Sequence, residues 1–129
     1  LLAGGGRWGE RGYFVEPTIL DGVAPDAAIA HQEVFGPVLS VLRFTDEDEA
    51  VAIANGTRYG LAAYLHTTDL ARAHRVAGRL RAGSVGINDA PAMCPSVPFG
   101  GVGMSGTGRE GGAAGLAEFY LPKNVFIGF

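Results

Sequence analysis

Apolar residues fall into short runs that alternate along the chain with segments of helical period. Residues 38–44 are nearly all apolar, which is typical of a strand covered on both faces. Within residues 69–80, apolar residues instead recur on one face of a helix. That face consists of Leu70, Ala73, Ala77 and Leu80. The two patterns predict a buried strand and, further along the chain, an amphipathic helix that ends by Gly83.

Weaker patterns of the same kinds complete the predicted order of elements. Further strands are expected at residues 14–20, 61–65 and 84–88, and short helices at residues 25–32, 45–54 and 111–118. Strands and helices that alternate in this way form parallel strand pairs joined by right-handed crossovers. We therefore expect an α/β fold, arranged as a partial three-layer sheet with parallel strands and crossover helices.

The helix at residues 45–54 carries its own start and stop signals. Thr45 is a good N-cap residue, and Asp48 stands at the capping-box spacing from it. The acidic run 46–49 falls in the first turn, where the helix dipole favours negative charge, so capping explains it better than a metal site does. The expected inner face is Ala50, Val51 and Ala54, and Asn55-Gly56 ends the helix.

Residues 120–129 form an apolar tail that no other predicted strand covers. Its apolar positions are Leu121, Val125, Phe126, Ile127 and Phe129. A bare hydrophobic edge invites association, and Pro122 limits regular pairing to the portion beyond it. We expect the tail to form a strand that pairs with another chain, and to be disordered or wrongly paired without one.

Composition limits the size, the partners and the compartment of the protein. The 129 residues suffice for one domain with a modest core, and 47% hydrophobic with 18% charged residues is typical of a globular protein. A net charge of −3 without a basic cluster predicts neither nucleic acid nor membrane as a partner. The single cysteine, Cys94, excludes an internal disulfide and fits the cytoplasm. Because the chain begins at Leu1 rather than Met, we expect a fragment.

The segment from Gln32 to Val38 holds the most specific combination of residues. The Glu33 carboxylate could accept hydrogen bonds from both hydroxyls of a ribose, and Phe35 would lie on the same side if the segment is extended. An aromatic face beside a ribose-binding acid could hold a nicotinamide ring, while Gly36-Pro37 restricts the backbone after it. By spacing alone, the favoured interpretation is an exposed acid and a core aromatic residue before a strand.

Other candidate residues carry weaker signals. Asn88 ends a predicted parallel strand, where ligands of α/β sheets bind, but a structural role for its amide is equally open. Cys94 has no histidine near it in sequence, which disfavours a nucleophile, and the histidines show no metal-ligand spacing. Glycine patterns at residues 101–106 and 106–111 spell a dinucleotide fingerprint, but they lack the preceding strand and the following acid that such a site needs.

Three motifs together resemble the aldehyde dehydrogenase superfamily. They read Gly-Tyr-Phe-Val-Glu-Pro-Thr at residues 12–18, Gln-Glu-Val-Phe-Gly-Pro-Val at residues 32–38 and Pro-Phe-Gly-Gly at residues 98–101. The resemblance runs in the family's order over nearly the whole chain, and it is to the C-terminal portion of the family only. It therefore implies that the family's catalytic cysteine and general-base glutamate lie outside this chain. One departure is Gly103, where many members have Lys.

The resemblance assigns roles to particular residues. It implies that Glu33 and Phe35 contact the nicotinamide ribose and ring of NAD or NADP, with Leu61 nearby. It implies that Asn88, Met93 and Phe99 line the entrance for a small aldehyde. It also implies a homo-oligomer, dimer or tetramer, built through the C-terminal strand. Residues 1–118 would then belong to the catalytic domain, and residues 119–129 would be an oligomerisation tail.

Three functions follow as hypotheses. The first is the C-terminal portion of an NAD(P)-dependent aldehyde dehydrogenase, with the 129 residues inactive by themselves. Its complete form would attack the aldehyde with a cysteine thiolate and release a carboxylic acid. The second is a non-catalytic module that folds or associates without chemistry. The third is a small thiol enzyme that uses Cys94.

Overall fold

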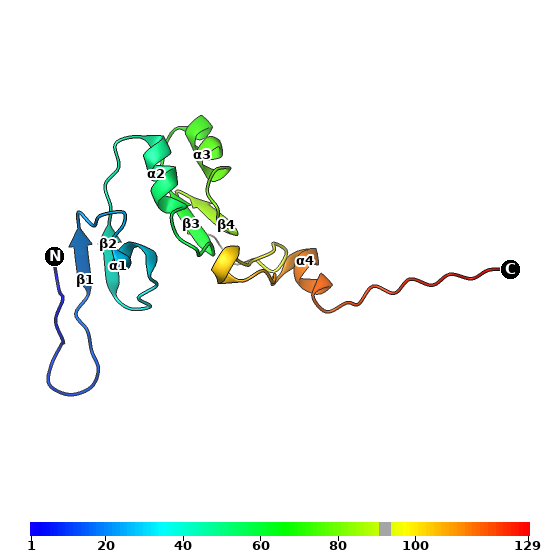
Figure 1. Cartoon of the computed structure of the whole chain (residues 1–129), viewed down its shortest axis with the longest axis horizontal. Helices are drawn as coiled ribbons and strands as arrows, with labels where there is room; N and C mark the ends of the chain where they lie inside the picture. Colours follow the sequence, from blue (N-terminus) through cyan, green and yellow to red (C-terminus); the bar gives the residue numbers. More distant parts are fainter. Residues whose placement is uncertain (91–93) are drawn as a thin grey trace. The chain divides into compact units, whose positions relative to one another are not determined.

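The computed structural model describes residues 1–90 and 94–129 of the chain, and they divide into two compact units. The first unit spans Leu1–Thr57 and the second Arg58–Phe129. Strands and helices alternate along the chain in the predicted order (Figure 1). The α/β class that the sequence predicts is therefore confirmed.

The first unit is built on a pair of short parallel strands. Strand β1 (Thr18–Asp21) pairs with β2 (Val38–Val41), and Thr18 lies opposite Val38 in the register. The single-turn helix α1 (Ala28–His31) falls in the connection between them, as the sequence predicts. Upstream of β1, isolated antiparallel bridges join Ala3 to Ile19 and Arg7 to Val15. The first residues of the chain thus run back along the segment that enters β1.

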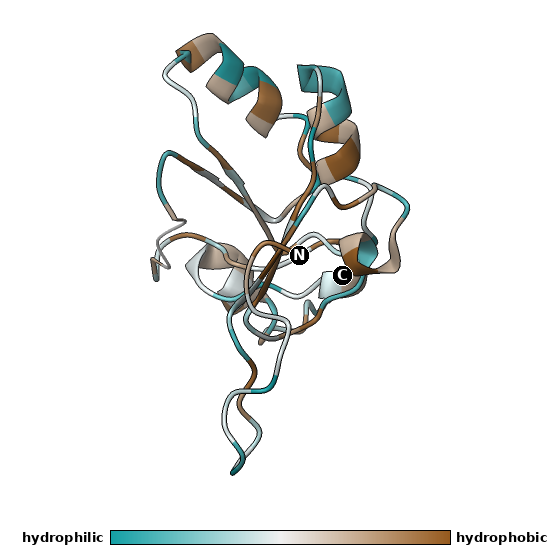
Figure 2. Cartoon of the chain, turned by 90° about the vertical axis from the view of Figure 1, so that its left-hand side faces the viewer, coloured by the Kyte–Doolittle hydropathy of each residue, from teal (hydrophilic) through white to brown (hydrophobic). Residues whose placement is uncertain are grey.

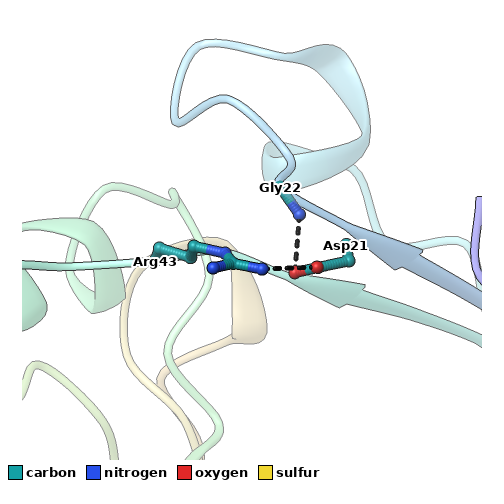
Figure 3. A network of polar contacts seen from close by, with 3 residues as sticks. All are labelled: Asp21, Gly22 and Arg43. Atoms are coloured by element: carbon teal, nitrogen blue, oxygen red, sulfur yellow. Dashed lines mark hydrogen bonds and ion pairs between the residues drawn. The ribbon is translucent and has the colours of Figure 1, made fainter.

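An ion pair joins the last residue of β1, Asp21, to Arg43, which follows β2 (Figure 3). The Asp21 carboxylate accepts a 2.7 Å hydrogen bond from the Arg43 guanidinium and a 2.8 Å bond from the Gly22 N–H. The bond from Arg43 holds the pKa of Asp21 below its ordinary value. The Arg43 side chain is 78% exposed, so solvent screens most of the attraction between the charges.

Helix α2 (Glu47–Ala54) completes the first unit, and its N-cap lies one residue later than predicted. Asp46, not Thr45, is the N-cap, because its side chain accepts a 2.9 Å bond from the Glu49 N–H. The Glu49 carboxylate in turn accepts 2.7 Å bonds from the Thr45 N–H and hydroxyl. The acidic run therefore caps the helix, as expected, and the Glu49 side chain reaches back to Thr45. Asn55 is the C-cap, as predicted.

The second unit repeats the strand–helix–strand pattern. Strand β3 (Ala62–Leu65) pairs in parallel with β4 (Ser84–Ile87), and helix α3 (Leu70–Ala77) lies in the crossover. A 3₁₀ turn, η1 (Gly103–Ser105), and helix α4 (Gly112–Ala117) follow. Each pair of strands is thus joined through a helical connection, which is the βαβ arrangement that the sequence predicts.

Helix α3 is shorter than its apolar period suggests. Asp69 caps its start by accepting a 3.0 Å bond from the Arg72 N–H, but the helix ends at Ala77 with Gly78 as the C-cap. Its buried residues are Ala73 and Val76. Leu70 was predicted on the inner face, yet it is 72% exposed. The predicted end near Gly83 was wrong because the nearer glycine, Gly78, stops the helix.

Few side chains are buried within the described residues. The buried hydrophobic residues are Val51, Ala73 and Val76, whereas large apolar side chains are exposed in both units. Ala54, predicted on the inner face of α2, is exposed. Apolar and polar residues alternate around the helices (Figure 2). A single chain therefore leaves exposed much of the apolar surface that a complete domain would bury.

Residues 120–129 form neither a helix nor a strand in the single chain. Their apolar side chains are exposed, with Leu121 at 96% and Phe126 at 89%. A lone strand has no partner for its backbone N–H and C=O groups, so a strand at this position would need another strand to pair with. Pairing of this tail with another chain stays a prediction.

Candidate functional site

The segment that carries Glu33 and Phe35 connects α1 to β2 and is held at both ends by backbone hydrogen bonds. At its start, the Gln32 N–H donates a 3.0 Å bond to the Ala28 carbonyl. At its end, the Pro37 carbonyl accepts a 2.8 Å bond from the Thr18 N–H, where β1 begins. The parallel strand pair therefore fixes where the segment ends.

Thr18 anchors this end of the segment. It is 7% exposed, and its hydroxyl donates a 2.8 Å bond to the Glu16 carbonyl and accepts a 2.9 Å bond from the Gly5 N–H. A buried hydroxyl that makes both bonds carries no desolvation penalty for unpaired polar atoms. The residue that holds Pro37 is thus itself firmly placed.

Glu33 presents its carboxylate to solvent. Among the described residues, no hydrogen bond or ion pair engages this side chain. A carboxylate without an internal partner keeps its acceptor positions for a ligand with paired hydroxyl groups. The geometry of Glu33 therefore fits the role of a ribose-binding acid.

Phe35 has an unusual backbone conformation. Its φ angle is 53°, in the left-handed region, and its side chain is 93% exposed. The premise of an extended segment, from which a shared side for Glu33 and Phe35 was predicted, is therefore wrong at this residue. Within this chain the ring is exposed and does not lie in a core. A bulky residue with positive φ costs about 1–3 kcal/mol, and such residues concentrate at ligand sites.

Leu61 lies in the second unit, directly before β3. Its side chain is 44% exposed, and its carbonyl accepts a 3.1 Å bond from the Ser84 N–H. The backbone of Leu61 thus extends the pairing of β3 with β4. Its exposed side chain agrees with the expected place near the nicotinamide better than with a core position.

Asn88 follows β4 and also has a positive φ of 56°, which asparagine tolerates well. Its amide Oδ1 accepts a 2.8 Å bond from the Thr67 N–H, and its Nδ2 donates a 2.8 Å bond to the Thr67 carbonyl. These two bonds support the structural role that the sequence left open. Because Nδ2 carries a second N–H, the amide still has one donor for a ligand.

The remaining residues predicted to line the aldehyde entrance are Met93 and Phe99. Met93 lies outside the described residues. Phe99 is partly buried and exchanges backbone bonds of 2.7 and 2.8 Å with Glu110. The loop is also held by Arg109, whose Nη1 donates to the carbonyls of Gly101, Thr107 and Gly108. Sequence reasoning missed Arg109, because nothing in its local pattern reveals which carbonyls a guanidinium will reach.

Cys94 is exposed at the start of this loop. Its Sγ lies 3.0 Å from the Ser96 hydroxyl, and this hydrogen bond holds the pKa of the Cys94 thiol below its ordinary value. The contact found for Sγ in the described part of the chain is with a serine and not with a histidine base. The structure therefore offers no support for a thiol enzyme built on Cys94.

Residues 1–90 and 94–129 contain neither a cluster of metal ligands nor a membrane-spanning helix. Within these ranges no three His, Cys, Asp or Glu side chains gather as metal ligands would. The same ranges contain no helix with the length and apolar character that a membrane span requires. The acidic first turn of α2 thus remains explained by capping.

The candidate residues form two groups, each within one unit. Glu33 and Phe35 share the loop before β2, whereas Leu61, Asn88 and Phe99 belong to the second unit. Sequence reasoning also missed His31, whose ring contacts carbonyl oxygens on either side of the first group. The one signal in the sequence is that His31 stands two residues before Glu33.

Comparisons with known proteins agree with these motifs. The model of the Aldehyde dehydrogenase family matches residues 1–125. The betaine aldehyde dehydrogenase of Brucella anthropi is 49% identical over 131 aligned positions, which cover 98% of this chain and 27% of that protein. The chain thus spans about 27% of the length of the curated relatives that it matches.

Solved structures show the same relationship. The NAD-dependent aldehyde dehydrogenase from Sinorhizobium meliloti is 47% identical, with a TM-score of 0.87 over 92% of this chain and 24% of that one. The indole-3-acetaldehyde dehydrogenase of P. syringae, a mutant with NAD+ and IAA, is 46% identical with the same TM-score, over 92% of this chain and 24% of its own. The family match, the identity and the shared backbone together show that this chain belongs to the aldehyde dehydrogenase family.

Proposed function

We propose that this chain is the C-terminal portion of an NAD(P)-dependent aldehyde dehydrogenase that oxidises an aldehyde to a carboxylic acid. The complete polypeptide is called the full-length enzyme below. The observation that carries the proposal is the segment 32–37, whose acid and aromatic residues are exposed while its two ends are held by backbone bonds. A ligand-binding loop needs this combination of accessible side chains and a fixed backbone.

Glu33 and Phe35 would hold the cofactor. The Glu33 carboxylate would accept hydrogen bonds from the two ribose hydroxyls, and the exposed ring of Phe35 would lie against the nicotinamide. When bound, the nicotinamide cofactor supplies the acceptor for the hydride. The contribution of the two residues is to hold the ribose and the ring in one orientation, with Leu61 as a further apolar contact.

The second unit would supply part of the aldehyde entrance. Asn88 has one N–H of its amide available for a substrate oxygen, and Phe99 adds an apolar wall, held by Glu110. Met93 completes this set as a prediction. The catalytic cysteine and the general base would come from the remaining portion of the full-length enzyme, so the 129 residues alone are expected to oxidise no aldehyde.

The class of substrate is proposed as a small aldehyde without naming one. Relatives 45–49% identical are betaine aldehyde dehydrogenases, yet a solved structure 46% identical is an indole-3-acetaldehyde dehydrogenase. A quaternary ammonium and an indole ring demand different pockets. Identity at this level therefore does not choose between them, and both aldehydes are suitable first substrates for an assay.

We also propose a cytoplasmic homo-oligomer. Exposed apolar residues at 119–129 favour association through this tail. Residues 1–118 would belong to the catalytic domain. NAD is the first cofactor to test, because the P. syringae structure contains NAD+.

The test is Glu33→Gln in the full-length enzyme. Glutamine keeps the shape of the side chain but loses charge-assisted bonds worth about 1.5–3 kcal/mol, so the Kd for NAD should rise by about 10- to 150-fold. The thermal midpoint should not change, because Glu33 is exposed. Glu10→Gln, at an exposed glutamate of the first unit, is the matched control. If cofactor affinity and turnover are the same in Glu33→Gln and wild type, Glu33 is only a surface acid.

The competing proposal of a non-catalytic module is decided by the same protein. The non-catalytic module would be favoured if the full-length enzyme binds NAD but oxidises none of the aldehydes tested, including the two named above. The thiol-enzyme hypothesis requires activity of the 129 residues that Cys94→Ala abolishes.

A further inference from the structure

His31 is the last residue of α1 and directly precedes the segment 32–37. Its ring reaches two backbone carbonyls that lie on either side of it in the sequence. Nδ1 is 3.0 Å from the Gly56 oxygen, and Nε2 is 2.6 Å from the Pro25 oxygen. The ring therefore joins the end of α1 to the loop before α1 and to the end of α2.

Both contacts of the ring are with acceptors. A carbonyl oxygen accepts a hydrogen bond and donates none, whereas a neutral imidazole has one N–H and one bare nitrogen. Only a ring with an N–H on each nitrogen donates both bonds. Gly56 lies just beyond the C-cap Asn55 of α2, at the end of a helix where positive charge is favoured. The ring thus meets an acceptor at each of its two nitrogens.

The position of the two His31 contacts matters because Phe35 lies in the segment that follows His31. Phe35 keeps its left-handed φ of 53° only if the chain on both sides is firmly held. The Pro37 carbonyl is held by the Thr18 N–H on the β1 side. On the α1 side, the ring of His31 provides the contact that spans the greatest distance in sequence, 25 residues to Gly56.

We propose that His31 is a positioning residue that holds the segment 32–37 so that Glu33 and Phe35 face the cofactor. The inference rests on the proposed function for its kinetic consequence, but not for its structural part. His31 is two residues from Glu33 and is not expected to touch the cofactor itself. It acts through the backbone that it fixes.

The experiment uses His31→Ala and His31→Lys in the full-length enzyme. Alanine removes both bonds, whereas lysine offers several N–H donors and no acceptor, as the two carbonyls require. His74→Ala, at an exposed histidine on α3, is the matched control. Two quantities are measured: deuterium exchange of the amides in residues 32–37, and the KM values for NAD and for the aldehyde.

In His31→Ala, the amides of residues 32–37 should exchange faster, and the KM for NAD should rise about tenfold for the loss of two ordinary hydrogen bonds. The KM for the aldehyde should stay within about twofold, since a change of that size is within ordinary surface effects. His31→Lys should recover most of both losses, and His74→Ala should show neither. A general loss of packing would not separate the two KM values in this way.

Unchanged exchange and an unchanged KM for NAD in His31→Ala would overturn the inference. If His31→Ala does not fold, His31→Lys decides: wild-type exchange with a wild-type KM for NAD supports a residue 31 that holds the segment through hydrogen bonds, and a raised KM for NAD with wild-type exchange overturns the inference. If the wild-type enzyme oxidises no aldehyde, the proposed function fails, while the exchange of residues 32–37 still decides whether His31 holds the segment.

Discussion

Asn88 and Thr67 are joined by a pair of 2.8 Å hydrogen bonds in which one side-chain amide satisfies both the N–H and the carbonyl of the other residue. Thr67 lies between β3 and α3, and Asn88 follows β4. The amide thus continues the parallel pairing by one step where the strands themselves have ended. The backbone N–H of Asn88 adds a 2.8 Å bond to the Leu65 carbonyl.

Asn88→Asp should destabilise the full-length enzyme although the side chains have nearly the same shape. The carboxylate loses the donor and faces the Thr67 carbonyl with a second acceptor, so the loss should be about 1–3 kcal/mol. Asn88→Gly loses both bonds but tolerates the positive φ, and should be more stable than Asn88→Ala by about 1 kcal/mol. Denaturant unfolding measures both differences. Equal stability of all four proteins would show that the amide pair contributes nothing.

Phe35→Gly should separate folding from binding. Glycine relieves about 1–2 kcal/mol of left-handed strain and costs about 0.5–1 kcal/mol of unfolded-chain entropy, so stability should not fall. Phe35→Ala keeps most of the strain and should be the less stable of the two variants. Both lack the ring and should bind NAD more weakly than wild type, as titration of cofactor fluorescence can show. Wild-type affinity for NAD in Phe35→Gly would show that the ring does not contribute to cofactor binding.

Gly83→Ala should prevent correct folding. A Cβ at residue 83 would overlap the Gly100 carbonyl oxygen, and backbone on both sides leaves no flexible side chain to move. The expected loss is about 3 kcal/mol or more. Gly78→Ala is the control, because a Cβ there meets the His74 oxygen at an ordinary 3.5 Å. Soluble yield and thermal midpoint compare the two. Similar values for both variants would contradict the close approach of residues 83 and 100.

The Asp21–Arg43 pair should make stability depend on acid. Its bond to Arg43 lowers the pKa of Asp21 from the ordinary 3.8, so the unfolded state binds a proton more readily than the folded state. The contribution is therefore present above the unfolded pKa and lost as pH falls through the lower folded pKa. Between wild type and Asp21→Asn, the difference in stability should shrink below about pH 4. Asp26→Asn, at an exposed aspartate, is the control. A difference that stays constant down to pH 2 would exclude the linkage.

Removal of residues 123–129 should lower the oligomeric state of the full-length enzyme. The tail exposes Val125, Phe126 and Ile127 in the single chain, and an uncovered apolar segment of this kind favours association. Light scattering over a range of concentrations compares the dissociation constants with and without the tail. An identical oligomer with an identical dissociation constant would show that another surface holds the subunits together.

The apolar pattern and the turn residues were enough to predict the order of strands and helices and the parallel pairing. Local signals decide these features: Asp69 and Asn55 cap their helices through bonds to near neighbours in the chain. The motifs at residues 32–38 and 98–101 were likewise enough to predict the family, because they are contiguous in sequence. Exact ends were harder, since Thr45 and Asp46 are both good caps and only the geometry chooses Asp46.

Only the tertiary structure decided what the candidate residues contact. The sequence does not reveal that Phe35 has positive φ, because that angle depends on how β1 and α1 hold the ends of its loop. Nor does it reveal that the ring of His31 meets carbonyls of Pro25 and Gly56, or that Asn88 pairs with Thr67. Such contacts join residues that are distant in the chain, and a periodic pattern contains no information on which backbone atoms a side chain will meet after folding.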